Sequence, residues 1–285
     1  MTTTISAAPR AWAPQDILDL VVTPTGGQSI AAQVATYRTG LTGSALRVPL
    51  VTADPSAAWV SESDEIPLSE AQLGEIDAAY KKLAGLVVVS RELAEDSDPN
   101  AAEQIGEGLV RDLARKLDAA WFGSNALNPK APAGLEDLTG VTVIEAPATL
   151  TDLDAFSVAR FRAANVGARL SGFVAHPDDA EMVATLKETS TSAKRLLSPD
   201  ATEAGELRID GIRLLTSPAC TPGTIWGIPE GRAVIGVRQD ADVRSDASAF
   251  FTSDRVAIRA TLRAAFAFSH PAAVVRISLN TPATG

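Results

Sequence analysis

The chain has little of the chemistry from which most catalytic and metal sites are built. Its 285 residues include one cysteine, Cys220, and two histidines, His176 and His270. A single cysteine excludes an intramolecular disulfide framework and is typical of a reducing compartment. No Cys-x-x-Cys or His-x-x-x-His pair occurs, so we expect no zinc site and no cofactor. Each histidine precedes a proline, which favours a turn or a strand end over a catalytic role.

Long hydrophobic runs are also missing. No stretch approaches the roughly 20 apolar residues of a membrane span, and the N-terminal residues lack the apolar segment of a signal peptide. The composition, 46% hydrophobic and 21% charged, is that of a globular protein with a core of its own. We therefore expect a protein without membrane contact that is made in a cytoplasm.

Two motif fragments lack the residues that would make them binding sites. Gly106-Glu107-Gly108 has no third glycine and falls inside a predicted helix, so a dinucleotide fingerprint is excluded. Asp240-Ala241-Asp242, followed by Asp246, lacks the central glycine and final glutamate of a calcium loop. A solvated turn is the simpler interpretation. No Gly-x-x-x-x-Gly-Lys sequence occurs, which excludes a P-loop.

Acidic side chains, in contrast, are plentiful. Glu62, Asp64, Glu65 and Glu70 lie close together, and a glycosidase would use such a pair in a cleft. Because these acids lie on a segment without helical periodicity that contains Pro67, we interpret them as an exposed rim and expect no enzyme. A hydrolase acting through the acidic loop is the alternative from a different class.

The net charge of −10 is unevenly distributed. Residues 54–98 carry eleven acids against three bases, whereas residues 231–285 carry seven arginines against four aspartates. Such asymmetry can steer association between copies, although a solvated acidic face would also explain it. The sequence shows no concentrated basic face of the kind that binds nucleic acid through charge.

Hydrophobic periodicity predicts one long helix. Its apolar residues recur every four positions, and Pro99 and Gly123 mark its start and its end. The members of this stripe are Ile105, Leu109, Leu113, Leu117 and Trp121. Residues 153–168 are predicted to form a second helix, and Pro177 is predicted to open a third.

Apolar runs elsewhere predict strands. Residues 46–51 are interrupted by Pro49, which favours an edge strand. Residues 54–72 then form the outgoing limb and tip of an extended loop, and residues 76–89 its return limb. The remaining predicted strands are 172–175, 209–215, 224–228, 232–237, 257–267 and 273–279. We expect the last three of these to lie beside the long helix.

Four short motifs recur in this order in one known family. They are Trp59-Val60-Ser61-Glu62, Ile66-Pro67, Val89-Ser90-Arg91-Glu92-Leu93, and Gly172-Phe173-Val174-Ala175-His176-Pro177-Asp178. With the spacing between them, over residues 47–279, the chain resembles the major capsid proteins of tailed bacteriophages, which have the Hong Kong 97-type capsid fold.

The resemblance implies an α+β fold with named parts. These are an N-terminal arm (1–46), an extended E-loop hairpin (47–89), a peripheral or P domain (90–128, with its spine helix at 100–123), an axial or A domain (129–237), and C-terminal strands that return to the P domain (238–285).

The implied function is structural. A member of this family builds hexamers and pentamers of itself into an icosahedral phage head that encloses double-stranded DNA without sequence-specific binding. The expected location is the virion, with assembly in the host cytoplasm. A separate scaffolding protein, a portal and a decoration protein are expected partners. An encapsulin-like nanocompartment, which encloses a cargo enzyme, is the alternative with the same fold.

Some members of the family cross-link an E-loop lysine to an asparagine of a neighbouring P domain with the help of a glutamate. In this chain no lysine precedes Lys81, and the other two positions align with Asp254 and Thr261. We therefore predict a shell without covalent cross-links.

Inter-subunit contacts are then expected from anchors and charge pairs. Trp12 and Trp59 are the expected anchors, since large aromatic residues dominate interfaces, and Pro67 is a further expected contact. Charge pairs are expected between two groups of residues, Glu62, Asp64 and Glu65 on one copy and Arg255, Arg259 and Arg263 on its neighbour. Asp254, beside Arg255, is a further expected contact. Trp12 and Trp59 would equally fit an ordinary core.

Overall fold

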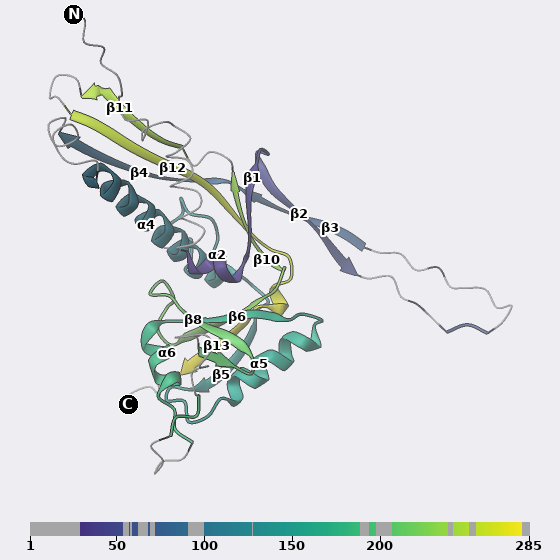
Figure 1. The fold of residues 1–285 in the computed structure, drawn as a ribbon. Coiled ribbons are helices and arrows are strands. Elements are labelled where there is room, and N and C mark those ends of the chain that lie inside the picture. Colours follow the sequence, from purple (N-terminus) through teal and green to yellow (C-terminus); the bar gives the residue numbers. More distant parts are fainter. Residues whose placement is uncertain are drawn as a thin grey trace, which may run out of the picture.

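The computed structural model describes residues 29–53, 57, 59–61, 68, 72–90, 100–126, 128–188, 194–197, 207–238, 242–250 and 255–280. These residues form a five-stranded sheet with one long helix, a two-stranded hairpin, and a six-stranded sheet with two shorter helices (Figure 1).

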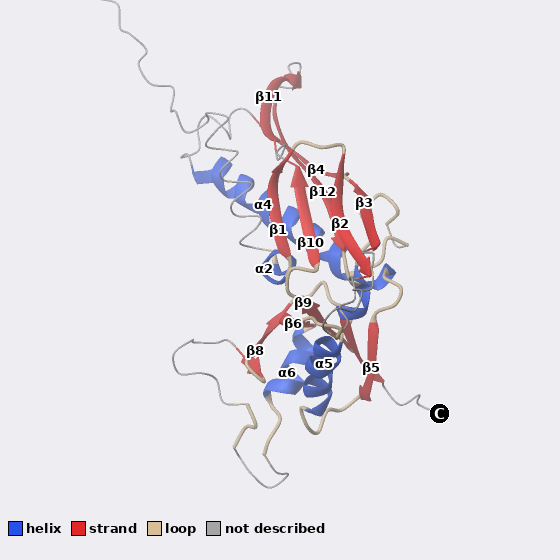
Figure 2. Cartoon of the chain, turned by 90° about the vertical axis from the view of Figure 1, so that its right-hand side faces the viewer, coloured by secondary structure: helices blue, strands red, loops and turns tan. Residues whose placement is uncertain are grey.

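The five-stranded sheet is centred on β12 (Arg255–Phe268). One path of neighbours runs from β1 (Thr36–Leu41) through β10 (Ala233–Arg238) and β12 to β11 (Asp242–Phe250). β4 (Lys81–Ser90) pairs antiparallel with the first ten residues of β12. The β1–β10 pair is parallel, and the other pairs are antiparallel. Figure 2 shows these strands side by side.

The long helix α4 (Asn100–Phe122) covers one face of this sheet and confirms the predicted helix. Leu113, Leu117 and Trp121 belong to the expected stripe, and Val110 and Phe122 are buried beside them. Together they pack on alternate residues of β12, as helical and strand periodicities require. From α4 these are Val110, Leu113, Leu117, Trp121 and Phe122, and from β12 they are Ala260, Leu262, Ala264, Phe266 and Phe268. Trp121 meets Phe266 edge-on, with ring centroids 4.9 Å apart.

The hairpin consists of β2 (Ala45–Ala53) and β3 (Gln72–Ala79) and projects away from the body of the molecule (Figure 1). In a two-stranded ribbon both strands are edges, which is why Pro49 is tolerated. The return limb of the hairpin is shorter than expected, because it ends at Ala79 and not at Val89. The following strand, β4, joins the five-stranded sheet, where its residues Leu83, Val87 and Val89 lie on the side that α4 covers.

The six-stranded sheet has the order β5-β13-β9-β6-β8-β7. Its strands are β5 (Thr142–Pro147), β6 (Leu170–Ala175), β7 (Leu207–Ile209), β8 (Ile212–Thr216), β9 (Thr224–Pro229) and β13 (Val275–Asn280). The helices α5 (Asp154–Asn165) and α6 (Pro177–Ala184) pack on it through Phe156, Ala159 and Val183. The short 3-10 helices η2 (Leu135–Asp137) and η4 (Pro271–Ala273) lie in connections.

Two strands lie in a different sheet from the one expected. β13 was predicted beside the long helix, but it pairs with β5 and β9, so that prediction is wrong. β10 falls inside the segment 129–237 that was assigned to the A domain, yet it pairs with β1 and β12. Both strands are apolar, and an apolar pattern indicates burial without indicating which sheet provides it.

The described part of the expected N-terminal arm is also built into the core. α2 (Ile30–Val34) buries Ala31 and Val34, and β1 extends the five-stranded sheet. Residues 1–46 were expected to form an N-terminal arm, and from Ser29 onward these residues pack on the rest of the chain. The helix predicted from Pro14 lies outside the described residues.

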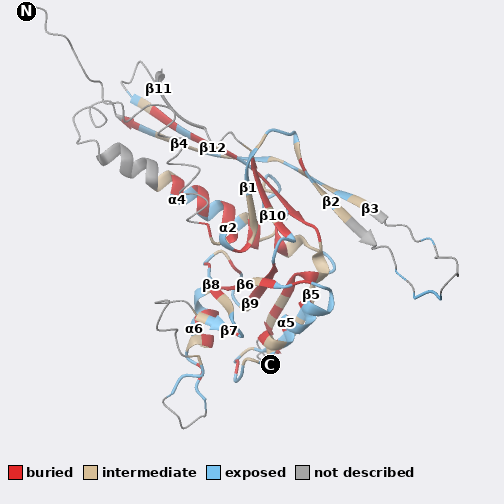
Figure 3. Cartoon of the chain, turned by 45° about the vertical axis from the view of Figure 1, so that its right-hand side comes forward, coloured by how far each residue is buried: buried red, intermediate tan, exposed pale blue. Residues whose placement is uncertain are grey.

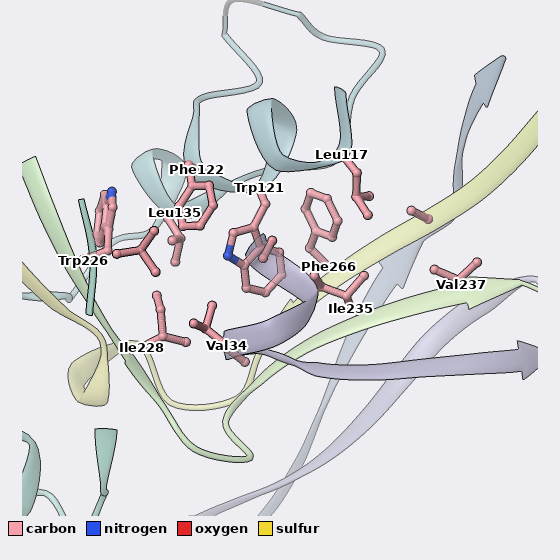
Figure 4. Close-up of a cluster of buried hydrophobic side chains, with 14 of the residues drawn as sticks. Val34, Leu117, Trp121, Phe122, Leu135, Trp226, Ile228, Ile235, Val237 and Phe266 are labelled. Carbon is pink, nitrogen blue, oxygen red and sulfur yellow. The ribbon is translucent and has the colours of Figure 1, made fainter. Parts of the chain in front are cut away.

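One hydrophobic cluster joins the two sheets. It combines Trp121 of α4 and Val34 of α2 with Ile235 of β10 and with Trp226 and Ile228 of β9 (Figure 4). Buried residues accordingly run without a break from the upper sheet into the lower one in Figure 3. The hairpin, in contrast, is buried only at its base, where Leu46 meets Ala265 and Ala267.

Candidate inter-subunit surfaces

The far end of the hairpin exposes two large apolar side chains. Trp59 has a relative exposure of 105% and Leu68 of 101%, so neither contacts the rest of the chain. An exposed aromatic residue on a projecting arm is typical of a surface that another molecule covers. The other contacts predicted in this region, at Glu62, Asp64, Glu65 and Pro67, lie outside the described residues, as does Trp12.

Arg255, Arg259 and Arg263 lie on one face of β12, and all three are exposed. Residues four apart share a face of a strand because side chains alternate with a period of two. The intervening residues that face α4 are buried, so the arginines lie on the opposite side of the sheet. The structure thus brings the three predicted arginines together. Asp254 lies outside the described residues.

The same face exposes apolar side chains that sequence reasoning missed. Leu86 is 61% exposed and Val88 38% exposed, and their register partners on β12 are Arg259 and Ala257. In the sequence, residues 83–89 form one apolar run within the expected return limb. In a strand with a single buried face, alternate side chains of such a run are exposed to solvent.

A groove of about 550 Å³ opens where β4 begins, between the C-terminal half of α4 and the loop that follows it. Lys81, Lys82, Lys116 and Lys130 line it together with apolar residues that include Leu117 and Phe266. The four lysines are exposed, whereas Leu117 and Phe266 belong to the core. No sequence pattern indicates this groove, because the residues that line it are far apart along the chain.

A buried carboxylate fixes the start of α2 on the middle of the molecule. Asp118 of α4 accepts hydrogen bonds from the Ser29 hydroxyl (2.5 Å), the Ile30 amide (3.0 Å) and the Ala31 amide (3.1 Å). Burial raises the pKa of Asp118 above its usual value, and these three hydrogen bonds oppose the rise.

A second carboxylate holds the loop after α4. Asp137 accepts hydrogen bonds from the Ser124 hydroxyl (2.5 Å), the Asn125 amide (2.8 Å) and the Gly134 amide (2.9 Å). Desolvation acts to raise the pKa of Asp137, but the three hydrogen bonds outweigh it, so the pKa lies below the usual value. Asp137 is therefore ionised at neutral pH and ties both ends of the loop together.

The thiol and the two histidines occupy structural positions. Cys220 is buried, and burial together with the negative charges of Asp118, Asp179 and Glu136 raises its pKa to about 12. His176 precedes α6, where its Nδ1 accepts a hydrogen bond from the Asp178 amide (3.3 Å). His270 lies at the turn before η4. Both histidines are thus at strand or turn ends, as predicted.

Within the described segments, no group of three or more His, Cys, Asp or Glu side chains is arranged to hold a metal ion. Their helices are too short or too polar to cross a membrane.

A family model described as the phage capsid family matches residues 11–279. The chain belongs to the phage capsid family. A member of this family is a structural component of the virion capsid. No curated protein matches the sequence.

Solved structures show the same fold. A chain from Gordonia phage Cozz has a TM-score of 0.70 at 21% identity, over 90% of this chain and 87% of its own. A chain from Microbacterium phage Oxtober96 has a TM-score of 0.71 at 16% identity, over 98% and 96%. The capsid of an empty GTA particle gives 0.71 at 17% identity, over 99% and 94%. The predicted Hong Kong 97-like α+β capsid fold is confirmed.

The strand-to-helix passage that contributed to the resemblance is present in this phage capsid protein. β6 ends at Ala175, His176 caps the next helix, and Pro177 is the first residue of α6. Proline is favoured at that position because its missing amide hydrogen would lack a partner there in any case.

Proposed function

We propose that this chain is the major capsid protein of a phage head, and that it assembles through hexamers and pentamers into an icosahedral shell around double-stranded DNA. The observation that carries the proposal is the hairpin with its exposed Trp59, which has no burial in its own chain. An arm of this kind gains apolar burial only on another molecule, and closed assemblies of identical copies are the common way to provide one.

The parts of the fold take the roles implied by the resemblance. The five-stranded sheet with α4 acts as the P domain, the six-stranded sheet acts as the A domain at the capsomer axis, and β2 and β3 form the E-loop. A separate scaffolding protein directs assembly in the host cytoplasm, and a portal and a decoration protein complete the particle. The enclosed DNA is bound without sequence specificity.

The shell is held without covalent cross-links. The first lysine, Lys81, begins β4 and lies beyond the paired strands of the hairpin, so the tip carries no amine for an isopeptide. Thr261, where the family's glutamate aligns, is a residue of β12 and cannot act as a base. Assembled shells boiled in SDS should release the 29.6 kDa monomer. A ladder of oligomers that survives this treatment contradicts the proposal.

Charge pairs between copies add to the packing. We propose that Glu62, Asp64 and Glu65 face exposed basic side chains of a neighbouring copy, which include the arginines of β12. Each exposed pair contributes about 0–1 kcal/mol, so the effect depends on the large number of copies. Stable interfaces commonly bury about 2,000–5,000 Å², and most of the attraction comes from that area.

The first experiment is size-exclusion chromatography with light scattering, followed by negative-stain imaging of the heaviest fraction. Pentamers, hexamers or closed shells are expected for the full chain. A variant in which a short glycine linker replaces residues 54–71 retains β2 and β3 and should remain folded without closing into shells. Normal shells from that variant, or a full chain that stays monomeric with and without a scaffolding protein, would contradict the proposal.

A further inference from the structure

The groove beside Lys81 has a charge that is unusual for this protein. Among the residues that the structure describes, four lysines and no acidic residue line it, although the whole chain carries a net charge of −10. Its lining is otherwise mostly apolar, with Leu83, Leu117 and Phe266 among its members. A hydrophobic surface surrounded by positive charge suits an apolar side chain carried on an acidic segment.

The groove is a built feature because its outer wall is fixed. That wall is the loop after α4, which includes Asn128, Lys130 and Pro132. Asp137 binds Ser124 and Asn125 at one end of the loop and Gly134 at the other. Gly134 also packs so closely on the last turn of α4 that a side chain there would collide with the carbonyl oxygens of Ala120 and Gly123. The groove is therefore present before any partner arrives, which lowers the cost of binding.

One segment of the chain matches the groove in both charge and apolar side chains. Residues 54–71 carry five acids and no base, and Trp59 and Leu68 within them are fully exposed. Other segments match less well. Residues 1–28 carry two acids and one arginine, residues 91–99 carry four acids and one arginine but no aromatic residue, and residues 281–285 have no charged side chain.

The matching segment must come from a second copy. The paired strand β3, Gln72–Ala79, separates the tip from Lys81. At about 3.3 Å per residue these eight residues span roughly 26 Å, so the tip could reach the groove of its own chain only if the hairpin came apart. Figure 1 shows the hairpin projecting away from α4.

We propose that Trp59 of one copy packs into the lysine-lined groove of a neighbouring copy, with the acids of its tip facing the lysines. This inference rests on the proposed shell and adds the docking site of the tip. A volume of about 550 Å³ accommodates an indole ring, and lysine ammonium groups are favourable neighbours of an aromatic face.

Engineered disulfides test the contact directly, because the native Cys220 is buried. Ser61→Cys, close to Trp59, is combined with Ala131→Cys in the groove wall, and the full chain is oxidised with copper phenanthroline under assembly conditions. The matched control combines Ser61→Cys with Ala164→Cys, an exposed alanine of α5. Disulfide-linked oligomers are expected for the groove pair at a yield roughly tenfold above the control, a differential of about 1.4 kcal/mol. Equal yields would overturn the proposal.

Charge reversal provides a second measurement. Lys116→Glu with Lys130→Glu should raise the concentration needed for shell formation roughly tenfold, whereas Arg115→Glu with Arg162→Glu, outside the groove, should leave it unchanged. Adding Glu62→Lys and Glu65→Lys to the groove variant should restore assembly. Normal shells from the groove variant would overturn the docking site and leave the capsid function standing. A wild-type chain that never assembles would overturn both.

Discussion

The Ser29 hydroxyl donates a 2.5 Å hydrogen bond to the Asp118 carboxylate, across 89 positions of sequence. Asp118 also accepts hydrogen bonds from the backbone amides of Ile30 and Ala31, so it caps the N-terminus of α2, a helix in another part of the chain. All three donors would lack an acceptor if the carboxylate were removed. The start of the described chain is thereby attached to the helix that covers the five-stranded sheet.

Asp118→Ala should lower the free energy of unfolding by about 1–3 kcal/mol, because it leaves buried donors without partners. Chemical denaturation of the unassembled chain, followed by circular dichroism, measures this loss. Asp112→Ala changes an exposed acid of the same helix and should stay within about 0.5 kcal/mol of wild type. Equal losses in the two variants would contradict a capping role for Asp118.

The raised pKa of Asp118 gives this residue a predictable pH dependence. The folded chain binds the proton more tightly than the unfolded chain, whose carboxyl titrates near 3.8. The pH-dependent part of the stability that Asp118 contributes is therefore fully present below pH 3.8 and declines as the pH rises through the folded-state pKa. The difference in unfolding free energy between wild type and Asp118→Asn should shrink over that range. A difference that widens with rising pH would contradict this assignment.

Gly134→Ala should destabilise the chain by about 1–3 kcal/mol, because the new methyl group meets the carbonyl oxygens of Ala120 and Gly123. Gly108→Ala is the matched control within α4. The methyl group there would lie 3.7 Å from the Arg111 guanidinium, and replacing a helical glycine by alanine contributes about 0.5–1 kcal/mol of stability. Thermal unfolding of both variants should therefore give shifts of opposite sign.

Cys220 should be inert in the folded chain. With a pKa of about 12, its thiolate fraction at pH 8 is lower than that of a free thiol by a factor on the order of 10³. Ellman's reagent should react with it slowly in buffer and rapidly in guanidinium chloride. Rapid reaction without denaturant would show that the loop around Cys220 opens readily.

Local patterns in the sequence predicted those parts of the fold that depend on neighbouring residues. Apolar residues at every fourth position up to Trp121 predicted α4, and the strand-to-helix motif that contains Pro177 predicted α6. Both predictions succeeded because helix periodicity and capping are local properties. The partners of apolar strands could not be predicted in this way. β10 and β13 both carry buried apolar side chains, and only long-range pairing places them in different sheets.

The same distinction between local patterns and long-range pairing applies to the candidate contact residues. The spacing of Arg255, Arg259 and Arg263 was enough to indicate one exposed face once β12 was a strand. The groove combines residues from β4, α4, the loop after it and β12, and no local pattern links Lys81 to Lys130. The capping role of Asp118 could not be predicted for the same reason, since its hydrogen-bond partners lie at residues 29–31.

The exposed arginines of β12 should make assembly sensitive to salt. Replacing Arg255, Arg259 and Arg263 by Gln removes three charges from an exposed face without disturbing the side buried under α4. If these arginines face the acidic tip of a neighbour, the variant should need a higher protein concentration to form shells, and its assembly should depend less on ionic strength, because the Debye length at 0.15 M is only about 8 Å. Light scattering between low and physiological salt measures both effects. Replacing Arg160 and Arg162 of α5 by Gln serves as the control and should leave the salt dependence unchanged, while an identical response in the two variants would show that net charge alone governs assembly.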